Sequence, residues 1–161
     1  MSETPTPHQL LQDRLDVADT IYRYASCIDT WDEKGLRAVL ADDLWAQYGN
    51  ADPISGGDAV AAWIGEATKD LVWQHHLLSV YHTEIDGDTA KALTYHTSYQ
   101  LAKDDPETVR VLIARYHQQL RRGANGWQLT RIVFEILWGE RRQDSTGFLA
   151  EVGGHGPHPV P

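Results

Sequence analysis

The chain has 161 residues, of which 42% are hydrophobic and 23% charged, and this composition is typical of a single globular domain. Its net charge of −9 at neutral pH repels phosphate groups, which argues against nucleic acids and anionic membranes as partners. The single cysteine, Cys27, cannot form an intramolecular disulfide, and no apolar run approaches the roughly 20 residues of a membrane span. Because the first residues, Met-Ser-Glu-Thr-Pro, also lack the pattern of a signal peptide, we expect a cytoplasmic protein.

Both ends of the chain are expected to be tails. Residues 1–7 contain two prolines and show no apolar periodicity, and residues 143–161 end in a run rich in Gly and Pro. These boundaries place the domain at residues 8–142. Three apolar residues of the C-terminal tail would form a lid over a pocket if the tail folds back, with a disordered tail as the alternative: Phe148, Leu149 and Val152.

Three helices are predicted in the first half of the chain. Residues 8–29 carry apolar side chains at three- and four-residue spacing, which is typical of an amphipathic helix. The apolar positions of this helix are Leu11, Leu15, Ala18, Ile21, Tyr22, Ala25 and Ile28. Residues 33–40 predict a short second helix with Asp32 as its N-cap. A third helix is capped by the turn at residues 55–58, and the helical half ends near Asp70.

The second half of the chain is rich in the residue types that favour strands. Four long strands are expected, at residues 72–85, 89–101, 108–121 and 127–138. Turn residues at 86–88 and 123–126 predict two hairpins, and residues 44–48 are a candidate for an earlier short strand. An α+β fold follows, with three N-terminal helices packed on a curved antiparallel sheet. Strands of this length are expected to curl into a concave wall, so that a cone-shaped pocket forms against the first helix.

Two residues near the end of the first helix are candidates for chemistry. Tyr24 and Asp29 are five positions apart, which separates them by about 140° around an ideal helix. They share a pocket only if the helix end unwinds or if the pocket wraps around it. Asp29 alone is compatible with a solvated carboxylate or a cap for the next helix, but its apolar neighbours Ile28 and Trp31 favour a carboxylate with a partner.

Histidines on the predicted strands are the second group of candidates. His75 and His76 are adjacent and point to opposite faces, so only one of them enters a pocket. A carboxylate that is hydrogen-bonded to one imidazole nitrogen fixes the tautomer and makes the other nitrogen a general base near neutral pH. On the next strand, His96 and Ser98 share one face. Tyr48 is either a pocket hydroxyl or an ordinary core residue.

The order of these elements resembles that of a known protein family. Residues 86–90 (Asp-Gly-Asp-Thr-Ala) lie at the first hairpin, residues 114–117 (Ala-Arg-Tyr-His) in the third long strand, and Gly126-Trp127 opens the last strand. Over residues 8–142 the arrangement is similar to the SnoaL-like branch of the nuclear transport factor 2-like (NTF2-like, cystatin-like α+β) superfamily. This branch resembles scytalone dehydratase, bile-acid 7α-dehydratase and γ-hexachlorocyclohexane dehydrochlorinase.

The resemblance implies a set of catalytic residues. In those enzymes a Tyr or Lys and an Asp lie at the end of the first helix, and a His lies on the first long strand. Carried over to this sequence, the catalytic residues are Tyr24, Asp29 and His76. The distance to the first hairpin selects His76 rather than His75. Three residues are then expected on the same strand face as His76: Leu78, Val80 and His82.

A further set of residues is expected to line the substrate pocket. They are Tyr48, His96, Trp45, Phe134 and Trp138. His96 would take the place of a second His that scytalone dehydratase carries on this strand. On the last strand, Ile136 joins Phe134 and Trp138 to cap an apolar chamber. On the opposite face, Arg131 and Glu135 are expected to form an exposed ion pair.

The activity implied by the resemblance is that of a cofactor-independent lyase or isomerase, with dehydration preferred. The expected substrate is small, cyclic and largely apolar, such as a polyketide, steroid or terpenoid intermediate. His76 would remove a proton next to a carbonyl, while Tyr24 with Tyr48 or His96 assists the leaving hydroxyl or stabilises the enolate. The sequence has neither a metal-ligand spacing nor a glycine-rich phosphate loop, so no metal and no cofactor is expected.

Self-association is expected because the open face of a curved sheet needs cover, and the sequence leaves dimer and trimer equally open. The family resemblance also leaves a non-catalytic alternative. The chain would then be a ligand-binding protein or a β-subunit-like partner of an aromatic-ring-hydroxylating dioxygenase.

Overall fold

The structure is a computed structural model that describes residues 6–143, and this part of the chain forms an α+β fold. The helices are α1 (Pro7–Asp29), α2 (Glu33–Ala38) and α3 (Gly57–Thr68). The strands are β1 (Leu40–Tyr48), β2 (Ile54–Ser55), β3 (Leu71–Asp86), β4 (Thr89–Ala102), β5 (Asp105–Gly123) and β6 (Gly126–Gln143). None of the described helices is long and apolar enough to cross a membrane. The candidate lid residues of the C-terminal tail lie outside the described residues.

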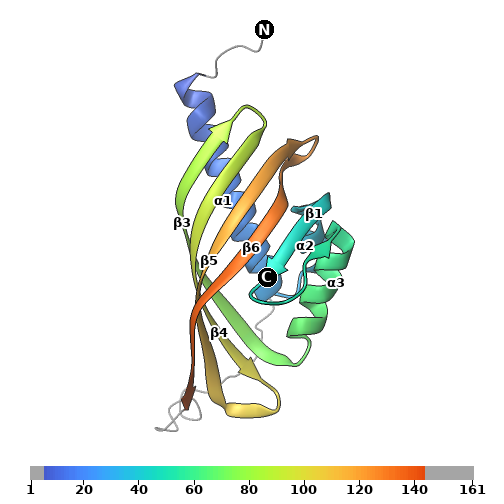
Figure 1. Cartoon of the computed structure of the whole chain (residues 1–161), viewed down its shortest axis with the longest axis vertical. Coiled ribbons are helices and arrows are strands. Elements are labelled where there is room, and N and C mark those ends of the chain that lie inside the picture. Colours follow the sequence, from blue (N-terminus) through green and yellow to red (C-terminus); the bar gives the residue numbers. More distant parts are fainter. Residues whose placement is uncertain (1–5, 144–161) are drawn as a thin grey trace.

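The six strands form one sheet in the order β2-β1-β6-β5-β4-β3. The four long strands make the predicted antiparallel meander. The sheet as a whole is mixed rather than antiparallel, because β1 runs parallel to β6 on the far side of the meander. Figure 1 shows the long strands twisting strongly, with α1 crossing behind them and with β1, α2 and α3 grouped along one side. Since the order leaves β3 at an edge, its outer backbone groups need partners from elsewhere.

Helix α1 begins with a capping box, in which the side chains of Thr6 and Gln9 each accept a hydrogen bond from the other residue's backbone N–H. Its buried residues are Val17, Thr20, Ile21, Tyr24, Ala25, Cys27 and Ile28. The predicted apolar face was therefore partly wrong, since Leu11, Leu15 and Tyr22 are exposed. The helix carries two apolar stripes, and contact with β3 and β6 selects the one that contains Tyr24.

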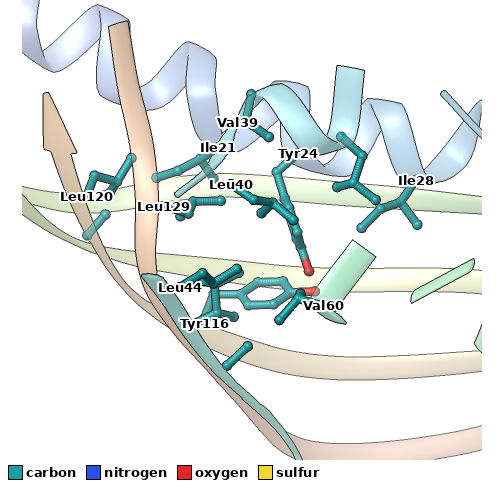
Figure 2. Close-up of a cluster of buried hydrophobic side chains, with 14 of the residues drawn as sticks. Ile21, Tyr24, Ile28, Val39, Leu40, Leu44, Val60, Tyr116, Leu120 and Leu129 are labelled. Carbon is teal, nitrogen blue, oxygen red and sulfur yellow. The ribbon is translucent and has the colours of Figure 1, made fainter. Parts of the chain in front are cut away.

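The core lies where α1 and β1 meet the inner face of β4, β5 and β6. Figure 2 shows Tyr24 of α1 pointing into this cluster toward Tyr116 of β5, with Leu44 of β1 beside them. The ring centroids of Tyr24 and Tyr116 are 6.0 Å apart at an angle of 85°, which is an edge-to-face contact. The core therefore brings phenol hydroxyls to the inner face of the sheet.

A bulge in β3 changes which residues face inward. The pairing with β4 shifts register between Val80 and His82. Beyond this bulge Thr83 is buried and the side chain of His82 is 64% exposed. The expectation that His82 shares the face of His76 is therefore wrong, because simple alternation does not hold across the inserted residue.

The turn between α1 and α2 contains a strained residue. Trp31 has a φ of 53°, a left-handed conformation that a bulky side chain rarely adopts. The turn lets Asp32 cap α2, where its side chain accepts a hydrogen bond of 2.8 Å from the backbone N–H of Gly35, as predicted. The N-cap of α3 is Gly56, which lies inside the predicted turn at residues 55–58, and the side chain of Asp58 pairs with Arg37.

Candidate functional site

The last residue of α1 contacts one histidine of β3 twice. Asp29 Oδ1 lies 2.5 Å from His76 Nδ1, and Asp29 Oδ2 accepts a hydrogen bond of 2.9 Å from the backbone N–H of His76. The two side chains are 18% and 8% exposed. The second contact explains the first, because the outward N–H of an edge strand needs an acceptor and the carboxylate supplies it.

This geometry fixes the tautomer of His76. A carboxylate oxygen can only accept a hydrogen bond, so the 2.5 Å contact at Nδ1 is a donation from the imidazole to Asp29. In the neutral ring, Nε2 is then the unprotonated nitrogen and can accept a proton. The pair therefore has the arrangement of a general base held by a carboxylate.

Asp29 contacts His76 from outside the cavity and does not line the cavity itself. Helix α1 stays helical through Asp29, and the cavity does not wrap around it. Tyr24 and His76 line the cavity, whereas Asp29 is not among the described residues that do so. The angle of about 140° between Tyr24 and Asp29 is compatible with one site because Asp29 reaches it only through His76.

A pair of tyrosine hydroxyls lies inside the cavity. The hydroxyl oxygens of Tyr24 and Tyr48 are 2.7 Å apart, and Tyr48 stacks on Trp63 of α3 at a centroid distance of 4.6 Å. Burial raises the pKa of Tyr24 well above its ordinary value, and the neighbouring Tyr48 raises it further. Burial also raises the pKa of Tyr48. Both phenols therefore stay protonated, and the pair has one hydroxyl hydrogen left to donate to a ligand.

His96 is the second histidine of the cavity. It is 3% exposed, and neither of its ring nitrogens has a hydrogen-bond partner within residues 6–143. Its ring packs 5.1 Å from that of His76 and edge-on to Tyr116 and Phe134. Burial, with a smaller effect of His76, lowers the pKa of His96 to about 3. His96 is therefore neutral near pH 7 and offers a ligand one donor and one acceptor.

These side chains surround a cavity of about 280 Å³ between α1, α3 and the inner face of the sheet. The volume is just below the usual range for small-molecule sites, which starts near 300 Å³. None of the described lining residues is Asp, Glu, Lys or Arg. Residues 6–143 also contain no group of three or more His, Cys, Asp or Glu side chains that could hold a metal ion. The cavity suits a compact, uncharged ligand with a few polar atoms.

Of the other predicted pocket residues, the structure places some in the cavity and others outside it. Phe134 lines the cavity together with Tyr48 and His96. Trp45 faces the other side of the sheet, where the guanidinium of Arg131 lies 3.9 Å from its ring centroid. Trp138 is 46% exposed and is not one of the described lining residues.

The last strand departs from simple alternation. Its pairing with β5 shifts register after Ile136, so Trp138 no longer shares the face of Phe134. The predicted ion pair between Arg131 and Glu135 also does not form. Glu135 contacts Arg115 at 3.2 Å and His117 at 3.0 Å instead.

The lining residues that were missed in the sequence include Trp63, Gln74, Gln100 and Tyr116. Gln74 lies two positions before His76 and faces inward with it, and Gln100 is its partner on β4. Strand alternation counted from His76 would have found both. Trp63 carried no such signal, because its position depends on how α3 docks against β1.

Comparison with known proteins identifies the chain's relatives. The model of the SnoaL-like domain matches residues 9–133. An uncharacterized protein of Mycobacterium tuberculosis is 23% identical over 124 residues, which cover 76% of this chain and 84% of that protein.

Solved structures show the same fold. The Kfla4162 protein of Kribbella flavida superposes with a TM-score of 0.75 at 20% identity, covering 81% of this chain and 95% of that one. A hexachlorocyclohexane dehydrochlorinase, LinA-type3 of Novosphingobium barchaimii, superposes with a TM-score of 0.74 at 12% identity, covering 82% and 91% of the two chains.

Proposed function

The chain belongs to the SnoaL-like domain family, and from this membership and the geometry of the cavity we propose that it is an acid–base lyase or isomerase that needs no cofactor. The observation that carries the proposal is the contact between Asp29 and His76 at the wall of an uncharged cavity. Its substrate is a small, cyclic, largely apolar compound with a carbonyl group, such as a polyketide, steroid or terpenoid intermediate. The family membership supports this reaction class, and the fold shared with a dehydrochlorinase is compatible with an elimination.

In the proposed reaction, Nε2 of His76 removes a proton from the carbon next to the substrate carbonyl. Asp29 holds the imidazole in the required tautomer and stabilises its positive charge once the proton is taken up. The pair of Tyr24 and Tyr48 donates its free hydroxyl hydrogen to the oxygen on which negative charge develops. His96, which remains neutral, supplies a second donor without repelling the protonated His76.

Dehydration is preferred over isomerisation within this scheme. After proton removal the enolate expels a hydroxide from the neighbouring carbon, and a proton from the tyrosine pair or from the charged His76 turns the leaving group into water. If no leaving group is present, the same proton returned at another carbon completes an isomerisation. The substrate therefore decides the outcome.

The proposal is tested by proton exchange, which needs no knowledge of the natural substrate. The wild-type protein is incubated in D₂O with a panel of cyclic ketones, and deuterium uptake next to the carbonyl is followed by NMR. The variant His76→Ala should lose about 10²- to 10⁴-fold in exchange rate while it keeps its fold. His75→Ala is the matched control, because His75 is exposed on the opposite face of β3. Undiminished exchange in His76→Ala would contradict the mechanism.

Self-association belongs to the same proposal, as a homodimer or homotrimer. The face of the sheet turned away from α1 carries exposed apolar residues, which we call the outer patch: Leu77, Tyr81, Tyr95, Ile113 and Leu137. Contiguous exposed apolar surface usually marks an interaction site. Arg115, His117 and Glu135 bring both signs of charge beside the patch, which suits pairing of this face with its own copy.

The outer patch is also the observation that favours the non-catalytic alternative. A β-subunit-like protein of an aromatic-ring-hydroxylating dioxygenase would use this face for a larger partner. Co-purification with an iron-containing partner, together with absence of proton exchange by the wild-type protein, would support that alternative over the enzyme.

A further inference from the structure

Gln74, a residue of the cavity wall, carries a buried hydrogen-bond acceptor that is unused within the described chain. The residue is 6% exposed and lines the cavity with His76. Its Nε2 donates a hydrogen bond of 2.7 Å to the backbone carbonyl of Ile28, in the last turn of α1. Its Oε1 is buried and has no hydrogen-bond partner among the residues the structure describes.

The orientation of this amide is fixed by chemistry. The carbonyl oxygen of Ile28 can only accept a hydrogen bond, so the NH₂ group of Gln74 must face α1 and Oε1 must face away. A buried acceptor without a partner destabilises the empty protein, and a ligand that donates a hydrogen bond removes this penalty. Gln74 Oε1 can be satisfied by a hydroxyl or an amine but not by an ether or a carbonyl oxygen.

The position of Gln74 relative to the proposed base defines where this donor must be. Gln74 and His76 point to the same face of β3, and residues two apart on a strand are about 7 Å apart. A substrate whose reacting carbon faces His76 therefore meets Gln74 across the width of a single six-membered ring. The lining contains no described carboxylate or cationic side chain here, so an uncharged hydroxyl is the donor that fits.

Building on the proposed function, we propose that Gln74 is a specificity residue that selects cyclic ketones carrying a hydroxyl group on the side of the ring opposite the reacting centre. The buried, unpartnered Oε1 and its placement beside His76 carry this inference. It narrows the substrate from a small cyclic ketone to a hydroxylated one. The hydroxyl that Gln74 binds is not the one that leaves, because the leaving group must lie next to the carbon that loses its proton.

Three ketones distinguish the effect of a hydroxyl donor from the effect of a larger ring substituent: cyclohexanone, 4-hydroxycyclohexanone and 4-methoxycyclohexanone. Binding to the wild-type protein is measured by NMR titration, with the side-chain NH₂ signals of Gln74 and the ring signals of His76 as reporters. We expect 4-hydroxycyclohexanone to bind about fivefold or more tightly than either of the others and to shift the Gln74 signals. Equal affinities for all three would overturn the inference.

Two variants assign the preference to a residue. Gln74→Met removes Oε1 at similar size, and the carbonyl of Ile28 keeps a contact from the backbone N–H of Trp31 at 3.3 Å. This variant should bind the three probes about equally. Gln100→Met is the matched control, since Gln100 is the cross-strand partner of Gln74 on β4 and also lines the cavity. This variant should keep the preference for 4-hydroxycyclohexanone. Loss of the preference in Gln100→Met but not in Gln74→Met would overturn the assignment.

The experiment separates this inference from the proposed function. If all three ketones shift the His76 signals with equal affinity, the cavity remains the binding site and only the role of Gln74 falls. If none of them shifts His76 or Gln74, the proposed function and the inference fall together. The wild-type titration gives this answer even if Gln74→Met does not fold.

Discussion

Asp29 combines two tasks that one substitution can separate. Its carboxylate accepts from both the backbone and the ring of His76. Asn in its place keeps the shape and one acceptor, but its NH₂ group can only donate, so it favours the tautomer with a proton on Nε2. We expect Asp29→Asn to lower the rate of proton exchange about 10²- to 10⁴-fold, with little loss of ligand affinity. Asp32→Asn, three residues on, is the control, because Asn caps a helix as well as Asp does.

His96 should make the stability of the protein depend on pH. Its pKa falls from 6.5 in the unfolded chain to about 3 in the folded protein, so between these values the unfolded state binds more protons. The stability contributed by neutral His96 is complete above about pH 6.5 and is lost as the pH falls toward 3, with a slope of at most about 1.4 kcal/mol per pH unit.

The comparison is with His96→Phe, which fits the surrounding aromatic side chains and cannot titrate. Urea unfolding at pH 4, 5, 6 and 7 should show a smaller loss of unfolding free energy in this variant than in the wild type. His82→Ala, whose wild-type side chain is 64% exposed, should behave like the wild type. Parallel curves for His96→Phe and the wild type would show that His96 is not held neutral by the fold.

For individual residues, the sequence indicated which side chains pair at the site but not how the side chains are oriented. The spacing and the family resemblance predicted that Asp29 would lie with His76, and the structure brings them together, while their catalytic roles stay predictions. The unpartnered oxygen of Gln74 could not be predicted, because it depends on which carbonyl of α1 meets the edge of β3. Trp138 was misplaced for a similar reason, since a register shift of one residue exchanges the two faces of a strand.

Among the helices, Gly65 and Gly35 test whether local packing overrides the higher intrinsic helix propensity of Ala relative to Gly. In a helix interior Ala is favoured over Gly by up to about 1 kcal/mol. Gly65 in α3 has nothing within 4 Å of the position of an added Cβ, so Gly65→Ala should raise the unfolding free energy by up to this amount. An added Cβ at Gly35 in α2 would lie 2.8 Å from Cys27 Sγ and closer still to the capping carboxylate of Asp32.

Gly35→Ala is therefore expected to lower the unfolding free energy by about 1 kcal/mol or more, because it displaces the N-cap and crowds the buried end of α1. Thermal and urea unfolding of the two variants check the sign of each change. If Gly35→Ala stabilised the protein, the turn around Trp31 would have to shift and make room for the added Cβ without loss of the Asp32 N-cap.

The elements themselves were largely readable in the sequence. Helical spacing and strand-favouring composition gave α1 and the four long strands to within a few residues at most ends, because both signals extend over many positions. The two-residue strand β2 was missed, since a segment this short carries no periodicity. The parallel pairing of β1 with β6 also left no local signal, because it joins residues 86 to 89 positions apart whose contact is decided by the packing of α1 and α3.

In the molecule as a whole, the candidate site depends on the edge strand β3, which is covered by helix α1. The end of α1 gives Asp29 to the backbone N–H of His76 and the Ile28 carbonyl to Gln74, so the same contacts that cover β3 orient two cavity residues. Loosening the end of α1 would therefore affect the sheet edge, the proposed base and the specificity residue together. The other face of the sheet has no such cover within the described chain, and this asymmetry leads to a prediction about assembly.

Two exposed apolar surfaces compete as the interface for self-association. One is the outer patch, and the other is the outward stripe of α1 that contains Leu11 and Leu15, each 57% exposed. We expect the outer patch to be the interface, because its residues lie on adjacent strands of one continuous surface and Tyr81 stacks on Tyr95 at 4.9 Å. A helix stripe with two exposed leucines is ordinary in a monomer.

Ile113 lies on β5 in the middle of the outer patch and is 40% exposed, so Ile113→Glu buries a charge in any assembly that uses this face. Light scattering coupled to gel filtration should show a dimer or trimer for the wild type and for Leu15→Glu, and a monomer for Ile113→Glu. Circular dichroism should be unchanged in both variants, since both residues are exposed. A monomer produced by Leu15→Glu but not by Ile113→Glu would instead assign the interface to α1, and the outer patch would then be free for a different partner.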